Sequence, residues 1–342
     1  MDNNIQRILQ SYLTSTYPNR QNLRVQNLRE ITSGWENEMY AFELFYGESG
    51  QHQESLVLRI YPGDDAYEKA AHEFQSMRTL EQEGFPVPSV SLLERDRSPF
   101  RNPFIIMEHI DGREMWEVMA QANPAEQMAL TDRFCELFVE LHKLDWQPFV
   151  DDPARIEAGD PYTFIDETIN QGERIIQQLD MTAMSPYLSW LKQRRDRIPC
   201  QRASVIHGDF HPANILLREN GSPVVIDWTG LRVSDARFDL AWTLLLVSMY
   251  MDEAAYDQFL DGYQHHAGVR VEQLSLFEAY AAIRRLVSVL ASIRGGAQTM
   301  GMRPGAEEIM QGQMDVLGKA YHLLVDRTGI RSDELEKWLN EG

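Results

Sequence analysis

A dense group of reactive side chains lies in the second half of the chain. It reads Val205-Ile-His-Gly-Asp-Phe-His-Pro-Ala-Asn-Ile-Leu-Leu217, and the apolar stretch Val224-Val-Ile-Asp-Trp228 follows closely. Aliphatic and β-branched residues dominate both ends of this region, so it predicts short strands. Between them, Asn220-Gly221 is a strong hairpin signal, because both residues tolerate positive φ. The sequence therefore predicts a hairpin with acidic and amide side chains near its open end.

A two-residue turn at this position sets the register of the predicted hairpin. A turn centred on residues 220 and 221 pairs Asn214 with Asp227 across the two strands. Together with Asp209, these side chains make an all-oxygen set suited to a hard cation such as Mg²⁺. Asp-x-x-x-x-Asn is also the spacing of kinase catalytic loops, in which the Asp accepts the substrate hydroxyl proton and the Asn holds a metal. The cluster predicts phosphoryl transfer.

Further parts of such a site are predicted upstream. Leu56-Val-Leu-Arg-Ile60 occupies the place of the kinase strand that carries a phosphate-binding Lys, with Arg59 instead. On the next predicted helix, Glu73 lies within the apolar stripe. A buried carboxylate needs a partner, so we expect Glu73 to pair with Arg59.

These motifs resemble the aminoglycoside phosphotransferase family, which consists of small-molecule kinases with a protein-kinase-like fold. The resemblance covers residues 31 to about 242. Its parts are the catalytic motif at 207–214 with 226–228, the nucleotide-covering loop Ile31-Thr-Ser-Gly-Trp-Glu-Asn37, the hinge Ile105-Ile-Met-Glu-His-Ile-Asp-Gly112, and Phe238-Asp-Leu-Ala241. Asp239 in the last motif is expected to hydrogen-bond the catalytic loop.

The resemblance implies a role for each matching residue. The donor is ATP or GTP, the acceptor is a hydroxyl group of a small molecule, and the metal is Mg²⁺. The implied site residues are Asp209 as catalytic base, Asn214 and Asp227 as metal ligands, Arg59 and Glu73 at the nucleotide phosphates, Ser33 and Gly34 in the covering loop, and the backbone from Glu108 to Ile110 at the nucleotide base. Gly34 stands almost alone, and the Asp-Phe-Gly and Ala-Pro-Glu elements of protein kinases are missing. Activation-loop regulation and a protein substrate are therefore not expected.

The predicted fold class is α+β, a two-lobed protein-kinase-like fold. Residues 1–110 form the nucleotide-binding lobe, an antiparallel sheet with one helix, after an amphipathic opening helix. Its predicted elements are strands 39–46 and 54–61, a helix over 64–83 with Asp64 or Asp65 as N-cap and a stop at Gly84, and strands 89–95 and 104–110. Residues 111–342 form a helical lobe with the catalytic loop 205–228 and the acceptor pocket. It is almost entirely helical after residue 229 and contains a helix capped by Asn123-Pro124.

Composition excludes several other classes of protein. With 52 acidic and 32 basic residues, the net charge is −20, which disfavours nucleic acid and anionic membranes as partners. Two cysteines, no long apolar run and no basic leader favour a cytoplasmic enzyme without a membrane anchor. The charge favours a cationic acceptor slightly, although it serves solubility equally well.

Two alternatives remain at this point. His207, Asp209 and His211 alternate as ligands would on one face of a strand, which is the pattern of a metallohydrolase. That interpretation leaves the Arg59–Glu73 pair unexplained. A nucleotide-binding pseudoenzyme is the other alternative. The sequence does not identify the acceptor molecule, the preferred nucleotide (ATP or GTP) or the oligomeric state.

Overall fold

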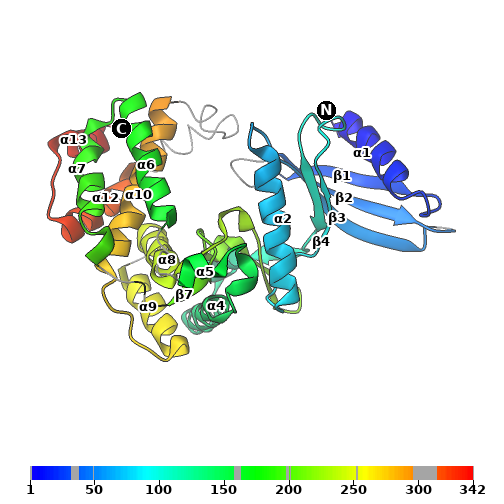
Figure 1. The fold of residues 1–342 in the computed structure, drawn as a ribbon. Coiled ribbons are helices and arrows are strands. Elements are labelled where there is room, and N and C mark those ends of the chain that lie inside the picture. The colour runs from blue at the N-terminus through cyan, green and yellow to red at the C-terminus, as the bar shows by residue number, and fades with distance from the viewer. Residues whose placement is uncertain are drawn as a thin grey trace. The chain divides into compact units, whose positions relative to one another are not determined.

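The structure, a computed structural model, describes most of the chain. The described residues are 2–31, 38–48, 50–157, 163–197, 200, 202–251, 253–295 and 314–341. They form two compact units, whose elements are labelled in Figure 1. The first unit contains residues 1–114 and Ile215–Thr229, and the second contains Met115–Asn214, Gly230–Met300 and Pro304–Gly342. Residues 215–228 of the predicted catalytic loop therefore belong to the first unit.

The first unit is built on a five-stranded antiparallel sheet with the strand order β1-β2-β3-β5-β4. Figure 1 shows its two helices, α1 and α2, on opposite sides of this sheet. The elements are α1 (Asp2–Thr16), β1 (Arg24–Ile31), β2 (Glu38–Tyr46), β3 (His52–Ile60), α2 (Ala66–Gln82), β4 (Val90–Glu94) and β5 (Phe104–Glu108). The antiparallel sheet and the β2–β3 hairpin confirm the prediction for this part of the chain.

Alternation along β3 decides what each face of the sheet carries. Leu56, Leu58 and Ile60 face the core under α1, where they pack with Leu9 and Leu13. Because side chains alternate along a strand, Arg59 lies on the opposite face, towards α2.

The ends of α2 fit the prediction only in part. Gly84 adopts φ +78° just after the helix, a left-handed conformation that glycine adopts without steric cost. Asp65 occupies the N-cap position, which confirms one of the two predicted candidates, but its side chain makes no capping hydrogen bond. The φ of −91° and ψ of 17° at Asp65 lie outside the extended region from which a side chain reaches the first free amides.

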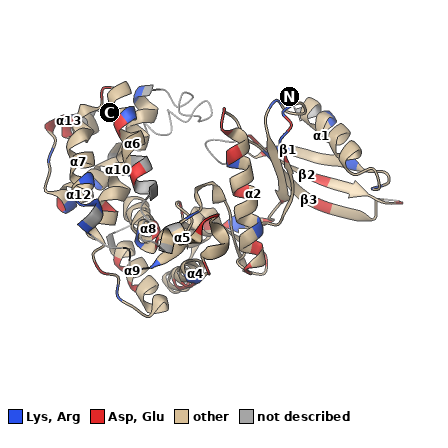
Figure 2. Ribbon diagram, viewed as in Figure 1, with Lys and Arg blue, Asp and Glu red and all other residues tan. Residues whose placement is uncertain are grey.

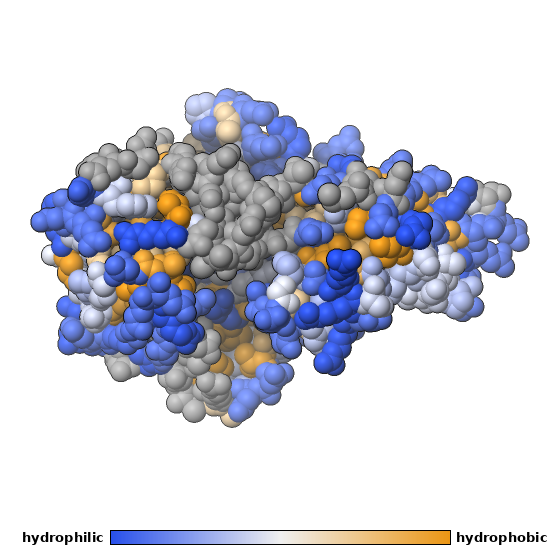
Figure 3. Space-filling view, turned by 90° about the horizontal axis from the view of Figure 1, so that it is seen from above, coloured by the Kyte–Doolittle hydropathy of each residue, from blue (hydrophilic) through white to orange (hydrophobic). Residues whose placement is uncertain are grey.

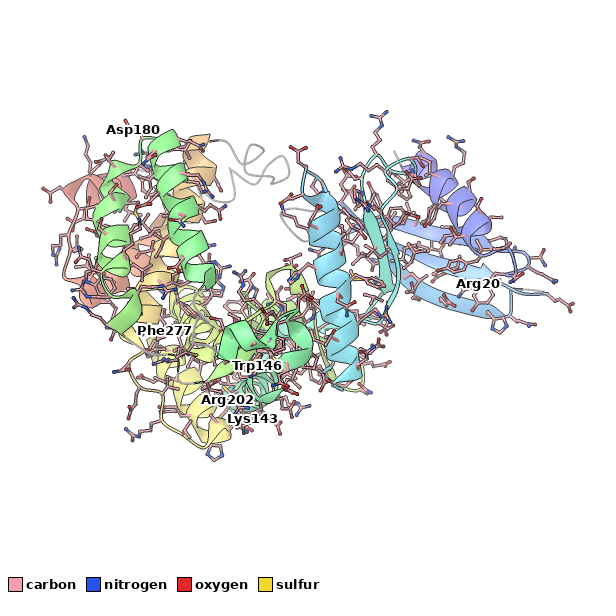
Figure 4. All side chains as sticks on the ribbon, viewed as in Figure 1. Arg20, Lys143, Trp146, Asp180, Arg202 and Phe277 are labelled. Carbon is pink, nitrogen blue, oxygen red and sulfur yellow. The ribbon has the colours of Figure 1, made fainter. Side chains whose placement is uncertain are left out.

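Arg20, labelled in Figure 4, ties the end of α1 to the sheet. Its guanidinium carbon lies 4.6 Å from the ring centroid of Tyr17 and 4.3 Å from that of Tyr46. Its Nη1 lies 3.2 Å from Oε2 of Glu54 on β3. These contacts hold the chain between α1 and β1 against the β2–β3 hairpin.

A second, three-stranded sheet in the first unit contains the predicted hairpin, but in another register. It consists of β6 (Gly112–Glu114), β8 (Ile215–Arg218) and β9 (Pro223–Val225). Ile215 pairs with Val225, and the amide of Arg218 donates to the carbonyl oxygen of Ser222, so the loop has three residues, 219–221. The third, Gly221, has φ +80°. The prediction that Asn214 pairs with Asp227 is therefore wrong by one residue.

The second unit is mostly helical, as predicted. Its helices are α3 (Met115–Gln121), α4 (Pro124–Lys143), α5 (Pro153–Glu157), α6 (Thr163–Gln178), α7 (Ser185–Lys192), α8 (Ala236–Tyr250), α9 (Glu253–Ala267), α10 (Ser275–Gly295), α12 (Met314–Thr328) and α13 (Asp333–Glu341). Asn123 forms a complete capping box at the start of α4, which confirms that prediction.

One short ladder interrupts the helices of the second unit. β7 (Ala203–Ile206) pairs with β10 (Arg232–Asp235) in antiparallel fashion. The expectation that the chain is helical directly after residue 229 is therefore wrong. Arg232, Ser234 and Asp235 are polar, so the sequence lacks the apolar pattern that would predict this strand. Ser234 and Asp235 are nevertheless buried.

The surface carries its charge in dispersed form. Figure 2 shows acidic and basic residues distributed along the elements of each unit. On the face in Figure 3, hydrophobic residues lie in small groups among hydrophilic ones. None of the helices in the described ranges has the length and hydropathy that crossing a bilayer requires.

Truncation of Leu58 tests the core of the first unit. The side chain is fully buried under α1, so we expect Leu58→Ala to lower the free energy of unfolding by about 2–5 kcal/mol, measured by urea denaturation. Val269→Ala is the control, because Val269 is 64% exposed, and its effect should stay within about 0.5 kcal/mol. Equal effects of the two substitutions would contradict the packing described here.

Candidate active site

Arg59 lies at the centre of the polar cluster in the first unit. Its Nη1 lies 2.9 Å from Oε1 of Glu73 on α2, and its Nη2 lies 3.0 Å from Oδ1 of Asp227. The side chains of Arg59 and Glu73 are 8% and 1% exposed, whereas that of Asp227 is 41% exposed. The predicted pairing of Arg59 with Glu73 is confirmed. The additional bond to Asp227 shows that one guanidinium bridges both carboxylates.

Tyr61 completes the environment of this pair. Its hydroxyl donates a hydrogen bond to Oε2 of Glu73, and the backbone of Trp228 also hydrogen-bonds that carboxylate. Burial alone would lower the pKa of Arg59, but the neighbouring Glu73, Tyr61 and Asp227 outweigh it and raise that pKa above its ordinary value. Burial and the charge of Glu73 raise the pKa of Tyr61 well above its ordinary value. Arg59 therefore stays charged and Tyr61 stays a hydrogen-bond donor.

Asp227, two residues after the end of β9, lies in an unusual backbone conformation. Its φ of +66° is in the left-handed region, which Asp tolerates better than most residues. The next residue fixes the segment, because the buried Trp228 donates from Nε1 to the carbonyl oxygen of Val225 and packs against Phe85. Oδ1 of Asp227 accepts bonds from Arg59 and Thr229. Within the described residues, Oδ2 has no hydrogen-bond partner and can accept a ligand.

Two of the three backbone amides in the predicted hinge segment 108–110 already donate to carbonyl oxygens in the first unit. The amide of Glu108 donates to the carbonyl oxygen of Ser89 at 2.8 Å, and that of His109 donates to Ser55 at 2.9 Å. Within the described residues, the amide of Ile110 has no such partner. Of the three backbone amides predicted to contact a nucleotide base, that of Ile110 therefore stays the candidate donor. Ser33 and Gly34, predicted for the covering loop, lie outside the described residues.

In the second unit, Asp239 on α8 holds the backbone of the loop that contains Asp209. Its carboxylate accepts hydrogen bonds from the amides of His207 at 2.6 Å and Gly208 at 2.8 Å. Asp239 is 1% exposed and also lies 3.4 Å from Nε2 of the buried His142. The expectation that Asp239 hydrogen-bonds this loop is confirmed.

The carbonyl groups of the same loop are held as well. Thr243 donates to the carbonyl oxygen of Phe210 at 2.5 Å, and Arg284 on α10 donates to that of Gly208 at 2.6 Å. Gly208 has φ +83°, and a Cβ atom there would lie 2.9 Å from the carbonyl oxygen of Gly230. Only glycine fits this position without displacement of the chain.

The Asp209 side chain emerges from this fixed loop. Trp242 Nε1 donates to Oδ1 at 2.6 Å, whereas Oδ2 lies 3.6 Å from Nε2 of His211. The carboxylate is 39% exposed. Loss of solvent opposes its ionisation, but His211, Arg284 and the bond from Trp242 outweigh that effect and hold the pKa of Asp209 well below its usual range. Asp209 is therefore a carboxylate with one hydrogen-bonded oxygen, Oδ1, whereas Oδ2 is 3.6 Å from His211, beyond direct hydrogen-bond distance.

Asn214 is oriented by the same loop. Its Nδ2 donates to the carbonyl oxygen of Asp209 at 2.9 Å and lies 3.2 Å from Nε2 of His211. Since a carbonyl accepts only from the amide nitrogen, Oδ1 points away from this bond. The Oδ1 of Asn214 and the Oδ2 of Asp227 are hard oxygen donors of the kind that Mg²⁺ prefers. The chemistry of the donor set thus fits the predicted metal. Asn214 belongs to the second unit and Asp227 to the first.

The metallohydrolase alternative is contradicted by the structure. Residues 207–211 form a loop instead of a strand, so His207, Asp209 and His211 do not alternate on one face. His207 is fully buried, and its Nδ1 accepts a hydrogen bond from the amide of Asp209. Across the described residues, no group of three His, Cys, Asp or Glu side chains is arranged to hold a metal ion.

Several residues of the cluster were missed in the sequence. Asp239, Trp242 and Thr243 are spaced three and four residues apart, which places them on one face of α8. That spacing could have revealed Trp242 and Thr243 as partners of the loop. Arg284 and Tyr61 carried no local signal, because their contacts come from residues far away in the sequence.

The antiparallel sheet and the helical remainder form a protein-kinase-like fold, and comparison with known proteins identifies the family. The family model described as "Phosphotransferase enzyme family" matches residues 27–294, which is most of the chain. The chain belongs to this family, which includes the aminoglycoside phosphotransferases.

Solved structures with this fold cover nearly the whole chain. A provisionally named aminoglycoside phosphotransferase from Ralstonia eutropha JMP134 has a TM-score of 0.69 and 18% identity, covering 94% of this chain and 99% of that one. ADP-bound aminoglycoside phosphotransferase APH(2″)-Ib has a TM-score of 0.59 and 17% identity, covering 93% and 98% of the two chains. At these identities the similarity establishes the fold.

Curated relatives are much longer proteins. Acyl-CoA dehydrogenase family member 11 of Pongo abelii is 30% identical over 194 residues, which are 55% of this chain and 25% of that protein. Acyl-CoA dehydrogenase family member 10 of Mus musculus is 27% identical over 196 residues, 56% of this chain and 18% of that protein. The chain thus spans about a quarter or less of the length of these relatives.

The buried pair on α2 and β3 can be tested through stability. Glu73→Gln removes the charge that balances Arg59, so we expect the free energy of unfolding to fall by about 3–5 kcal/mol in urea denaturation. The double variant Arg59→Met with Glu73→Leu should recover most of that loss, because it buries no unpaired charge.

Glu136→Gln is the matched control for this test. Glu136 pairs with Arg133 at 2.5 Å, but both side chains are more than 40% exposed, so a change within about 1 kcal/mol is expected. A loss at Glu136 as large as that at Glu73 would contradict the assignment of a buried, tightly coupled pair.

Proposed function

We propose that this protein transfers the γ-phosphoryl group of ATP or GTP to a hydroxyl group of a small molecule, with Mg²⁺ as cofactor. The observation that carries the proposal is Asp209: a carboxylate on a rigid loop, with Oδ1 bound by Trp242 and Oδ2 open. Catalysis of phosphoryl transfer consists mainly of positioning and charge stabilisation, and a fixed, ionised carboxylate suits the task of orienting a hydroxyl nucleophile.

The first unit supplies the proposed nucleotide site. Arg59, held by Glu73 and Asp227, orients the phosphates, and the amide of Ile110 donates to the nucleotide base, next to the carbonyl group of Glu108. Ser33 and Gly34 are proposed for the loop that covers the phosphates. ADP and GDP are bound in structures of the same fold, which supports a nucleoside triphosphate donor.

Asn214 and Asp227 are the proposed metal ligands. When bound, Mg²⁺ would neutralise charge on the phosphates during transfer. The proposal requires Asn214, Asp227, Asp209 and Arg59 to act on one nucleotide during turnover. We place the reaction in the cytoplasm, where nucleoside triphosphates are available, and we propose neither nucleic acid nor membrane as a partner.

The acceptor is proposed only as a class. The net charge of −20 favours a cationic molecule, such as an aminoglycoside or an amino alcohol. Arg284 stands beside the Asp209 loop, so a cationic acceptor would have to carry its charge away from the reacting hydroxyl. We do not propose Trp228 or Tyr256 as acceptor contacts, because Trp228 is buried and the Tyr256 hydroxyl donates to Glu278.

A second acceptor class follows from the names of the curated relatives. Two relatives that are 30% and 27% identical over 55% and 56% of this chain are named acyl-CoA dehydrogenase family members, so an acyl thioester of coenzyme A that bears a hydroxyl group belongs in the acceptor screen. Such an acceptor is a polyanion, whereas an aminoglycoside is a polycation. The dependence of kcat/KM on ionic strength separates them, because a steep fall with added salt is expected for a cationic acceptor of this acidic protein.

Replacement of Asp209 tests the proposed reaction. We expect Asp209→Ala to lower kcat by about 10²- to 10⁴-fold, because the group that orients and deprotonates the hydroxyl is lost. Nucleotide affinity, measured by calorimetry with ATP or GTP in Mg²⁺, should remain within a few-fold of wild type. Turnover is measured as ADP or GDP release over an acceptor panel, and chelation of Mg²⁺ should abolish it.

The matched control is Asp261→Ala, at an exposed position of α9. It should leave both kcat and nucleotide affinity unchanged. Unaltered turnover in Asp209→Ala would show that the base is wrongly assigned. A wild-type protein that binds nucleotide but phosphorylates no acceptor would instead support the pseudoenzyme alternative.

A further inference from the structure

The strongest unassigned feature is a chain of contacts that leads from α10 through α8 to the carboxylate of Asp209. The guanidinium carbon of Arg284 lies 4.0 Å from the ring centroid of Trp242, and the indole Nε1 of Trp242 donates to Oδ1 of Asp209 at 2.6 Å. Arg284 also donates from Nη1 to the carbonyl oxygen of Gly208, the residue before Asp209. All of these residues belong to the second unit.

We infer that Trp242 and Arg284 are positioning residues that select which oxygen of Asp209 receives the acceptor hydroxyl. The inference rests on the proposed function and deepens it. Oδ1 is occupied by a short, charge-assisted hydrogen bond, which leaves Oδ2 as the oxygen for the hydroxyl. His211 Nε2, at 3.6 Å from Oδ2, is too far away to take this place with a direct bond.

The two residues restrain Asp209 in different ways. Trp242 is 7% exposed, and its edge binds the carboxylate while its face lies under Arg284. Arg284 restrains the backbone of the loop at Gly208 and the ring plane of Trp242 at the same time. A carboxylate on a freely rotating side chain would exchange its two oxygens. This pair of contacts removes that freedom before substrate binds.

The assignment fixes the course of the proposed step. The acceptor oxygen forms a bond to the γ-phosphorus while the bond from that phosphorus to the β,γ-bridging oxygen breaks, and the nucleoside diphosphate leaves. The hydroxyl proton passes to Oδ2 of Asp209. No other reactant is required, and the charge of Asp209 is neutralised in the step.

The test is a conservative substitution with a kinetic readout. Trp242→Phe keeps an aromatic face for Arg284 but removes the indole N–H. A hydrogen bond to a charged group is worth roughly 10- to 100-fold in rate, so kcat should fall by about that factor while KM for nucleotide and for acceptor stays within about twofold. Arg284→Lys, which keeps a cation, should retain more kcat than Arg284→Met.

Trp190→Phe is the matched control. Trp190 on α7 also lies under an arginine, with the Arg194 guanidinium carbon 4.4 Å from its ring centroid. Arg194 donates to the carbonyl oxygen of Trp190 itself, whereas Arg284 donates to the Asp209 loop, so Trp190→Phe should leave kcat unchanged. Wild-type kcat in Trp242→Phe, or a change confined to KM, would overturn the inference.

A spectroscopic measurement separates the contact from the activity. The chain has seven tryptophans, so ¹⁵N-tryptophan labelling gives seven indole N–H signals by NMR. The signal of Trp242 should lie downfield in the wild-type protein and move strongly upfield in Asp209→Ala. The measurement requires neither substrate nor a folded Trp242 variant. If no signal moves, the Trp242–Asp209 bond is absent and the inference fails. If the signal moves but wild type transfers no phosphate, the contact stands and the proposed function fails, together with the catalytic role of the contact.

Discussion

A single buried carboxylate, Asp239, fixes the loop on which the proposed chemistry depends. It takes two successive backbone amides, His207 and Gly208, as donors, so the loop cannot turn without breaking charge-assisted bonds in a dry environment. In the same turn Gly208 has a positive φ and approaches Gly230 too closely for a side chain. Asp209 projects from a rigid turn as a consequence. Rigid placement of this kind is what positioning catalysis requires, because small displacements of the reacting groups are costly in rate.

The first unit uses a buried carboxylate in the same way. Glu73 pairs with Arg59, and the second arm of the guanidinium reaches Asp227. A lysine ammonium is a point charge, whereas the planar guanidinium binds both carboxylates at once through separate nitrogens. The arginine at this position therefore couples α2, β3 and the segment after β9. In each unit, one buried acid organises a more exposed acid that is proposed to meet substrate or metal.

The sequence predicted the parts of this account that depend on local pattern. Alternation and the turn residues predicted the β2–β3 hairpin, and the apolar stripe around Glu73 predicted its pairing with Arg59. The register of the β8–β9 hairpin failed, because Asn220-Gly221 suits a two-residue turn and also the last two positions of the three-residue loop that is present. The role of Arg284 could not be predicted, because its contacts to Gly208 and Trp242 join segments that are far apart in the sequence.

Phosphorus NMR observes directly whether the protein transfers phosphate from a nucleotide to a hydroxyl group. Wild-type protein is incubated with ATP or GTP, Mg²⁺ and the acceptor panel, and the spectrum is followed over time. The account predicts that one acceptor yields a phosphomonoester signal in equal amount to the nucleoside diphosphate formed. Release of inorganic phosphate in place of the ester, or an unchanged nucleotide with every acceptor, would contradict it.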